Sequence, residues 1–252
     1  MNKTSVILGT IALEINRWSS RVPSFKVSDW IDKIRGDGFD GLELWENHVL
    51  LAEGEANRIK ESGFPVVVYN SYIGFEDAAR QKRDGAAEMI RFLGASSVKY
   101  NVGAGMDLFD EYKKNVREFA DMLPDNCLLL CECHAGTILE DNETAKQFFE
   151  GLPADKFGII LHPFNDASVL QERFNIFGAR IKQMHSQLVN ENSERVCLAS
   201  APEYVSSCMN ILKGNNFTGG FTIEFTGGTS MPGENIYCLF ENAKSDLNYL
   251  KL

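Results

Sequence analysis

The chain has 252 residues, of which 44% are apolar, and this is enough to bury a full hydrophobic core. Its formal net charge of −10 repels nucleic acid and anionic membranes, so we expect neither as a partner. An early apolar run is too short to span a bilayer and is soon followed by Glu14 and Arg17, so we expect no signal peptide, no transmembrane helix and a cytoplasmic location. A small polar molecule fits this composition best.

Eight short runs rich in β-forming residues recur along the chain at fairly even spacing. In chain order they are SVILGTIA from Ser5, GLELW from Gly41, PVVVYN from Pro65, SVKYNVG from Ser97, CLLLCEC from Cys127, FGIILH from Phe157, RIKQMHS from Arg180 and GGFTIEF from Gly219. Each run is predicted to form one strand.

Segments with apolar residues at three- and four-residue spacing lie between these runs and predict helices. The clearest of them cover residues 27–38, 76–95, 110–123 and 142–152. Several helices are predicted to end in a glycine just before the next strand, at Gly38, Gly63, Gly94, Gly178 and Gly214. Strand and helix therefore alternate in βα units along the chain.

The βα units predict a single α/β domain over residues 1–252, because no Pro/Ser-rich linker or charge block divides the chain. Dividing 252 residues by eight gives 31.5 per unit, which matches a (β/α)8 TIM barrel of about 250 residues. We therefore predict a closed barrel. A doubly wound open sheet is the alternative, but LGTIALEINRW carries only one glycine where that fold usually has a Gly-rich loop.

The fifth run, LLLCECHAG, reads as a buried strand that ends in polar residues. Alternate side chains of a strand face opposite ways, so Leu128, Leu130 and Glu132 share one face. A carboxylate is costly in the apolar layer between strands and helices. We therefore predict that Glu132 points into the barrel at its C-terminal rim, where active sites of this fold lie.

Three of the later strands end in the same way, with His162, His185 and Glu224. Together with Glu132 they bring two carboxylates and two imidazoles to one mouth of the barrel. This ligand set suits one divalent metal such as Mn, Zn, Co or Fe. A lone Glu or His at a strand end is more often a salt-bridged or capping group, but four of them on consecutive strands favour a metal site.

At this point the residues resemble the xylose isomerase-like TIM barrels, the sugar isomerase/epimerase superfamily, which includes ketose 3-epimerases, hydroxypyruvate isomerase, inosose dehydratase and AP endonucleases. The resemblance covers most of the chain and rests on the order of DGFDGLELW, LLLCECHAGTILEDNETA, His185 and FTIEF. It implies metal ligands at Glu132, His185 and Glu224. His162 stands where the family usually has Asp, and Gln187 where relatives commonly have Lys or another charged residue.

The function that the resemblance implies is metal-dependent isomerisation or epimerisation of a sugar or sugar-like keto compound through an enediolate. The metal would stabilise the developing charge. Glu132 and Glu224 would be the catalytic acid/base groups on opposing sides of the substrate, each with one oxygen on the metal and the other free to move protons. A homodimer is a further expectation from the family.

Five more residues are candidates for binding the substrate. His134 is in phase with Glu132 and could hold a hydroxyl or an oxyanion. Glu43 lies in the second strand on the same face as Trp45, although a one-residue register slip would exchange it with Glu46, and His48 follows in the loop. Asn165 and Gln187 are neutral groups suited to sugar hydroxyls.

Other functions stay open at this stage. A metal-dependent dehydratase of the inosose or dehydroshikimate type would use the same enolate to expel a β-hydroxyl group. A non-catalytic sugar-binding relative is suggested by His162 and Gln187. An AP endonuclease is disfavoured, because the chain has four histidines and an acidic balance.

Overall fold

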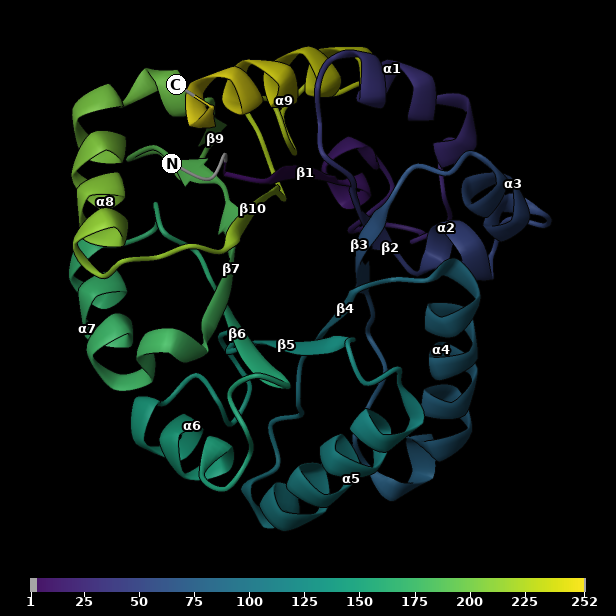
Figure 1. Cartoon of the computed structure of the whole chain (residues 1–252). Coiled ribbons are helices and arrows are strands. Elements are labelled where there is room, and N and C mark those ends of the chain that lie inside the picture. The colour runs from purple at the N-terminus through teal and green to yellow at the C-terminus, as the bar shows by residue number, and fades with distance from the viewer. Residues whose placement is uncertain (1–3, 252) are drawn as a thin grey trace.

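Eight parallel strands form a closed barrel inside a ring of helices in the computed structural model, which describes residues 4–251 (Figure 1). The strands follow one another around the barrel in chain order, and the last pairs with the first. They are β1 (Val6–Gly9), β2 (Leu42–Trp45), β3 (Val66–Asn70), β4 (Ser97–Tyr100), β5 (Leu128–Glu132), β6 (Phe157–Leu161), β7 (Ile181–Ser186) and β10 (Gly220–Ile223). The predicted (β/α)8 TIM barrel is confirmed.

The helices surround the strands on the outside of the barrel (Figure 1). The α-helices are α1 (Ile31–Gly36), α2 (Asn47–Leu50), α3 (Glu55–Glu61), α4 (Arg80–Leu93), α5 (Phe109–Met122), α6 (Asn142–Phe149), α7 (Ala167–Phe177), α8 (Pro202–Gly214) and α9 (Ile236–Leu250). The 3-10 helices are η1 (Thr10–Leu13), η2 (Val27–Asp29), η3 (Asp77–Ala79), η4 (Met106–Leu108), η5 (Gly178–Arg180) and η6 (Leu198–Ser200).

The elements differ from the sequence prediction at three places. The first run continues as η1 after Gly9 instead of as a strand. A short antiparallel hairpin, β8 (Leu188–Val189) and β9 (Arg195–Val196), follows β7 and was not predicted. α8 ends at Gly214 as predicted, but the left-handed conformation lies two residues later, at Asn216 (φ 54°), which Asn tolerates because its short side chain can bond locally.

The side chains of β5 alternate between two environments, as predicted. Leu130 belongs to a small apolar cluster with Ile7, Val68 and Ile160. Because these residues come from β1, β3, β5 and β6, they can meet only through the inside of the barrel. Leu129 and Cys131 belong instead to the large core between strands and helices. Glu132 therefore lies on the inward face, above an apolar floor.

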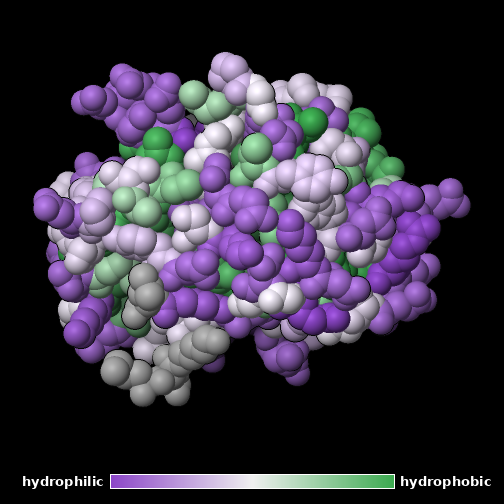
Figure 2. All heavy atoms as spheres, turned by 90° about the horizontal axis from the view of Figure 1, so that it is seen from above, coloured by the Kyte–Doolittle hydropathy of each residue, from purple (hydrophilic) through white to green (hydrophobic). Residues whose placement is uncertain are grey.

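Hydrophilic side chains predominate on the face of the molecule shown in Figure 2, with small hydrophobic patches between them. Of the helices described within residues 4–251, none is both long and apolar enough to cross a bilayer.

Candidate metal centre

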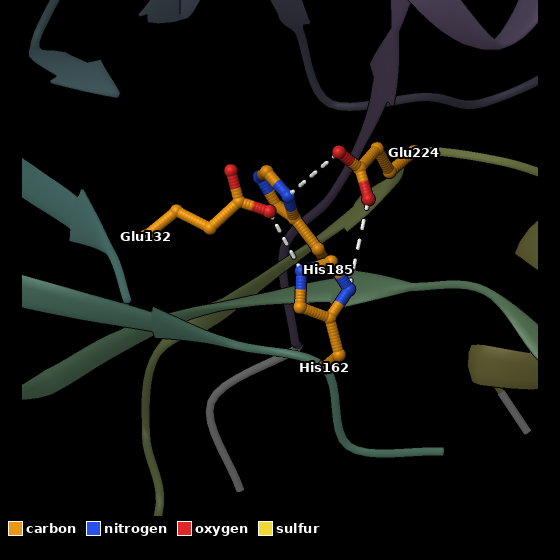
Figure 3. A group of neighbouring side chains, drawn as sticks. All are labelled: Glu132, His162, His185 and Glu224. Atoms are coloured by element: carbon orange, nitrogen blue, oxygen red, sulfur yellow. Dashed lines mark hydrogen bonds and ion pairs between the residues drawn. The ribbon is translucent and has the colours of Figure 1, made fainter. Parts of the chain in front are cut away.

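The barrel brings together the four residues predicted as metal ligands (Figure 3). Glu132 ends β5 and His185 lies in β7, while His162 and Glu224 directly follow β6 and β10. One possible ligand atom from each residue lies within 4.8 Å of the others. Glu132, His185 and Glu224 are buried and His162 is half-buried. We call these four residues the four-residue cluster.

The carboxylate of Glu132 is held on both of its oxygens. Its Oε1 lies 2.8 Å from His162 Nε2, and its Oε2 lies 2.8 Å from Lys99 Nζ. Asn101 Nδ2 donates to Oε2 as well, at 3.2 Å. Burial by itself would raise the pKa of Glu132, but Lys99 and then His162 outweigh burial and hold this pKa well below its usual range. Glu132 is therefore an anchored anion.

Glu43, on β2, orients His185 through the interior of the barrel. His185 Nε2 donates to Glu43 Oε2 at 2.9 Å. Thr222 Oγ1 donates to the same oxygen at 2.9 Å, and Asn70 Nδ2 donates to the other oxygen at 2.8 Å. Both side chains of the His185–Glu43 pair are fully buried. A carboxylate at Nε2 fixes the ring so that Nδ1 faces the cluster, as second-sphere carboxylates do for histidine ligands of metals.

Two buried atoms at the centre of the cluster have no hydrogen-bond partner, namely His185 Nδ1 and Glu224 Oε2. His185 Nδ1 lies 3.3 Å from Glu224 Oε1 without forming a hydrogen bond. Burial would lower the pKa of His185, but Glu43 and Glu224 raise it well above its usual value. A metal ion between these residues would give both atoms a partner, whereas a proton on Nδ1 would serve only the neighbouring Oε1. The residues present therefore fit a divalent metal.

His162 is tied to Gln187, so the two positions that depart from the family pattern are in contact. Gln187 Nε2 lies 3.0 Å from His162 Nδ1. An amide can donate to an imidazole nitrogen or, turned over, accept from it, whereas a lysine can only donate. The Gln187 side chain can therefore support either tautomer of His162, including the one that frees Nε2 for a metal.

A cavity of about 580 Å³ opens over the cluster. His134, Asn165 and Gln187 line it, together with Glu132, His162 and Glu224. Its other lining residues are Trp18, Tyr72, Lys99, Asn101, Cys133, Ala135, Thr137, Arg195 and Phe225. This volume lies in the range of small-molecule sites. Another cavity, of about 540 Å³ between α6 and α7, contains none of the four-residue cluster.

Glu43 and His48 do not line this cavity. Glu43 is fully buried and binds His185, as described above. His48 is also fully buried, with its ring centroid 4.7 Å from that of Phe25 and 5.4 Å from that of Trp45. Burial lowers the pKa of His48 to about 3. The structure thus separates these two residues from the other candidates for substrate binding.

Sequence reasoning missed several cavity residues, of which Lys99 is the clearest. The run SVKYNVG places this lysine within a buried strand, and lysine is almost never fully buried unless it is paired. That signal could have identified it. Arg195 and Trp18 had no comparable signal, because they lie in segments without a regular pattern.

The fold can be compared with known proteins. Neither models of protein families nor curated protein sequences match the chain. Among solved structures, a probable 3-DHS dehydratase, AsbF from Bacillus anthracis, is similar with a TM-score of 0.70 and 14% identity, over 99% of each chain. An IOLI protein with a bound zinc atom has a TM-score of 0.70 and 14% identity, over 98% of this chain and 97% of that one.

A xylose isomerase-like TIM barrel protein from Mycobacterium smegmatis, in complex with magnesium, has a TM-score of 0.63 and 12% identity, over 98% of this chain and 97% of that one. Endonuclease IV from Thermus thermophilus also has a TM-score of 0.63, at 13% identity and over 98% of each chain. Likeness at such low identity concerns the fold and does not choose between these activities. The resemblance inferred from the sequence is confirmed at this level: the chain has the fold of the xylose isomerase-like TIM barrels.

Proposed function

We propose that the protein is a metal-dependent isomerase or epimerase of a sugar or sugar-like keto compound. The observation that carries this proposal is the four-residue cluster beneath a cavity of small-molecule size, in which two buried atoms, His185 Nδ1 and Glu224 Oε2, lack hydrogen-bond partners. The reaction would remove a proton from the carbon next to a carbonyl group. When bound, a divalent cation supplies positive charge, which stabilises the negative charge that develops on the enediolate.

The two carboxylates are not equivalent, and this difference supports a role for Glu224 as the proton-transfer group. Both oxygens of Glu132 have close partners, whereas Glu224 Oε2 has no hydrogen bond and lies 3.6 Å from His162 Nδ1. Glu224 can therefore offer an oxygen to the substrate. Glu132 is the carboxylate that Lys99 and Asn101 hold in position.

This asymmetry favours isomerisation over epimerisation. Inverting one carbon needs a base on one face and an acid on the other, whereas isomerisation needs one group that carries a proton between adjacent carbons. Of the two carboxylates, only that of Glu224 has an oxygen without a hydrogen-bond partner. A dehydratase is the second candidate, and the same observation favours it, because one base suffices to start the loss of a β-hydroxyl group.

The test begins with the metal content of the purified protein and of the variants Glu132→Gln and Glu224→Gln. We expect about one transition-metal equivalent in the wild-type protein and less in either variant. A wild-type protein that takes up no metal from Mn, Co or Zn solutions would overturn the proposal and leave a non-catalytic sugar-binding protein as the better account.

The second step is to incubate the metal-saturated protein with aldoses and ketoses in deuterium oxide. We expect deuterium on the carbon next to the carbonyl group, and a loss of about 100-fold or more in exchange rate for Glu224→Gln. Glu132→Gln, measured at saturating metal, should lose less. A product that has lost a water molecule and absorbs as an enone would assign the dehydratase instead, and no exchange on any sugar would reject both.

A further inference from the structure

A half-buried arginine lines the cavity without a counter-ion. Arg195 belongs to β9, where Val189 pairs with it across the hairpin and Gly228 N donates to its carbonyl oxygen at 3.2 Å. Its backbone position is therefore fixed. Its Nε is buried and has no hydrogen-bond partner. Within residues 4–251, no carboxylate forms an ion pair with its guanidinium group.

Arg17 shows what a structural arginine looks like at the same place. Arg17 and Arg195 both lie near the ring of Phe225, at 5.9 and 4.6 Å from its centroid. Each nitrogen of the Arg17 guanidinium has a partner: Nη1 forms an ion pair with Glu234 at 2.6 Å, and Nε and Nη2 donate to the carbonyl oxygens of Ile11 and Ala12. Among residues 4–251, the guanidinium group of Arg195 has this aromatic contact but no ion pair, and its Nε has no hydrogen bond, so it lacks the contacts that fix Arg17.

The charges around the cavity leave Arg195 uncompensated. Three carboxylates lie in or beside the cluster, on Glu43, Glu132 and Glu224. The ammonium group of Lys99, which pairs with Glu132, and a divalent metal would together balance their three negative charges. Burial lowers the pKa of Arg195, although Glu224 opposes this, as expected for a cation that lacks a partner. One positive charge therefore remains on the cavity wall.

We propose that Arg195 binds an anionic group of the substrate, a carboxylate or a phosphate, so that the protein acts on an acidic polyhydroxylated compound rather than on a neutral sugar. This inference rests on the proposed function for the reacting end of the substrate. A guanidinium pairs with two oxygens of such a group. Trp18 and Phe225, whose ring centroids lie 5.6 Å apart, add an apolar wall beside it.

The experiment measures the binding of three six-carbon probes by calorimetry: D-gluconate, D-glucose 6-phosphate and D-glucitol. The metal-loaded wild-type protein is compared with Arg195→Gln, Arg195→Lys and the control Arg80→Gln, which changes an exposed arginine on α4. The probes bind free metal ions to the same extent whichever variant is present, so this binding does not affect the comparison between variants. Thermal unfolding and metal content check that each variant is intact.

We expect at least one anionic probe to bind the wild-type protein about tenfold or more tightly than glucitol. Arg195→Gln should lose this preference, Arg195→Lys should keep part of it, and Arg80→Gln should keep all of it. The preferred probe distinguishes a carboxylate from a phosphate. Equal binding of all three probes, a preference that survives in Arg195→Gln, or no binding of any probe at millimolar concentration would overturn the inference.

The outcome is separate from that of the proposed function. Arg195-dependent binding of an anion without any exchange of carbon-bound hydrogen would support the anion site and reject the isomerase. Exchange on a neutral sugar without a preference for anions would support the isomerase and reject the anion site.

Discussion

The two halves of the barrel contribute differently to the candidate metal centre. The half from β5 to β10 carries the four-residue cluster at the ends of its strands. The half from β1 to β4 contributes no member of the cluster, but Glu43 on β2 fixes His185 and Lys99 on β4 fixes Glu132. One half therefore supplies the candidate ligands, and the other positions them and affects their charge. Three predictions test the contacts that support the cluster, in order of decreasing effect.

The largest effect is expected from Lys99→Met. Removing one partner of a buried ion pair leaves an uncompensated charge, and we expect the free energy of unfolding of the metal-free protein to fall by about 4 kcal/mol. A saturating divalent metal should restore most of this loss, because the cation replaces the ammonium group next to Glu132. Urea unfolding with and without zinc measures both effects.

Lys182→Met is the matched control, since Lys182 lies in β7 and is half-buried without an ion pair among the described residues. Lys182→Met should lower the free energy of unfolding by much less, and zinc should not restore what is lost. Equal behaviour of the two variants would mean that Lys99 does not hold Glu132 in place.

The next effect concerns Asp246 on α9, which supports the cluster from outside the barrel. It accepts hydrogen bonds from Leu198 N and Thr226 Oγ1, at 2.7 and 2.6 Å, in the two segments that follow Arg195 and Glu224. Burial raises its pKa from 3.8 to about 6, against the effect of these two bonds. Because the folded state favours the protonated carboxyl group, this stabilisation is complete below about pH 4 and is lost as the pH rises through about 6.

The loss amounts to about 3 kcal/mol for a pKa raised by roughly two units. Asp246→Asn keeps a donor and an acceptor but cannot ionise, so its stability relative to the wild type should increase by about this amount between pH 4 and pH 7. Urea unfolding at the two pH values measures it. The exposed control Asp121→Asn should show no such change, and a wild-type-like pH dependence in Asp246→Asn would rule the effect out.

The smallest of the three effects is expected from Glu43→Gln, which keeps the shape of the side chain but removes its charge. His185 becomes a weaker ligand, and metal affinity should fall about tenfold or somewhat more. Competition with a chromophoric chelator measures this affinity. Glu46→Gln is the control, since the buried Glu46 binds Ser71 and Tyr72 instead of a cluster residue. An equal loss in both variants would mean that Glu43 does not tune His185.

Much of this centre could be predicted from the sequence, because it depends on local periodicity. The alternation of Leu130 and Glu132 with Leu129 and Cys131 identifies the inward face of β5, and the same pattern at later strands brings His185 to the same mouth. The order of the strands then follows from the rule that βα units wind in one direction.

The supporting contacts were decided by the tertiary structure alone. Glu43 and His185 are 142 positions apart, and they meet only because β10 closes the barrel onto β1. The pairing of Lys99 with Glu132 depends on the stagger of β4 against β5, and the position of Arg195 depends on a two-residue pairing in a hairpin. Local patterns determine which way a side chain faces, whereas its partner across a barrel depends on closure and stagger, which no short stretch of sequence contains.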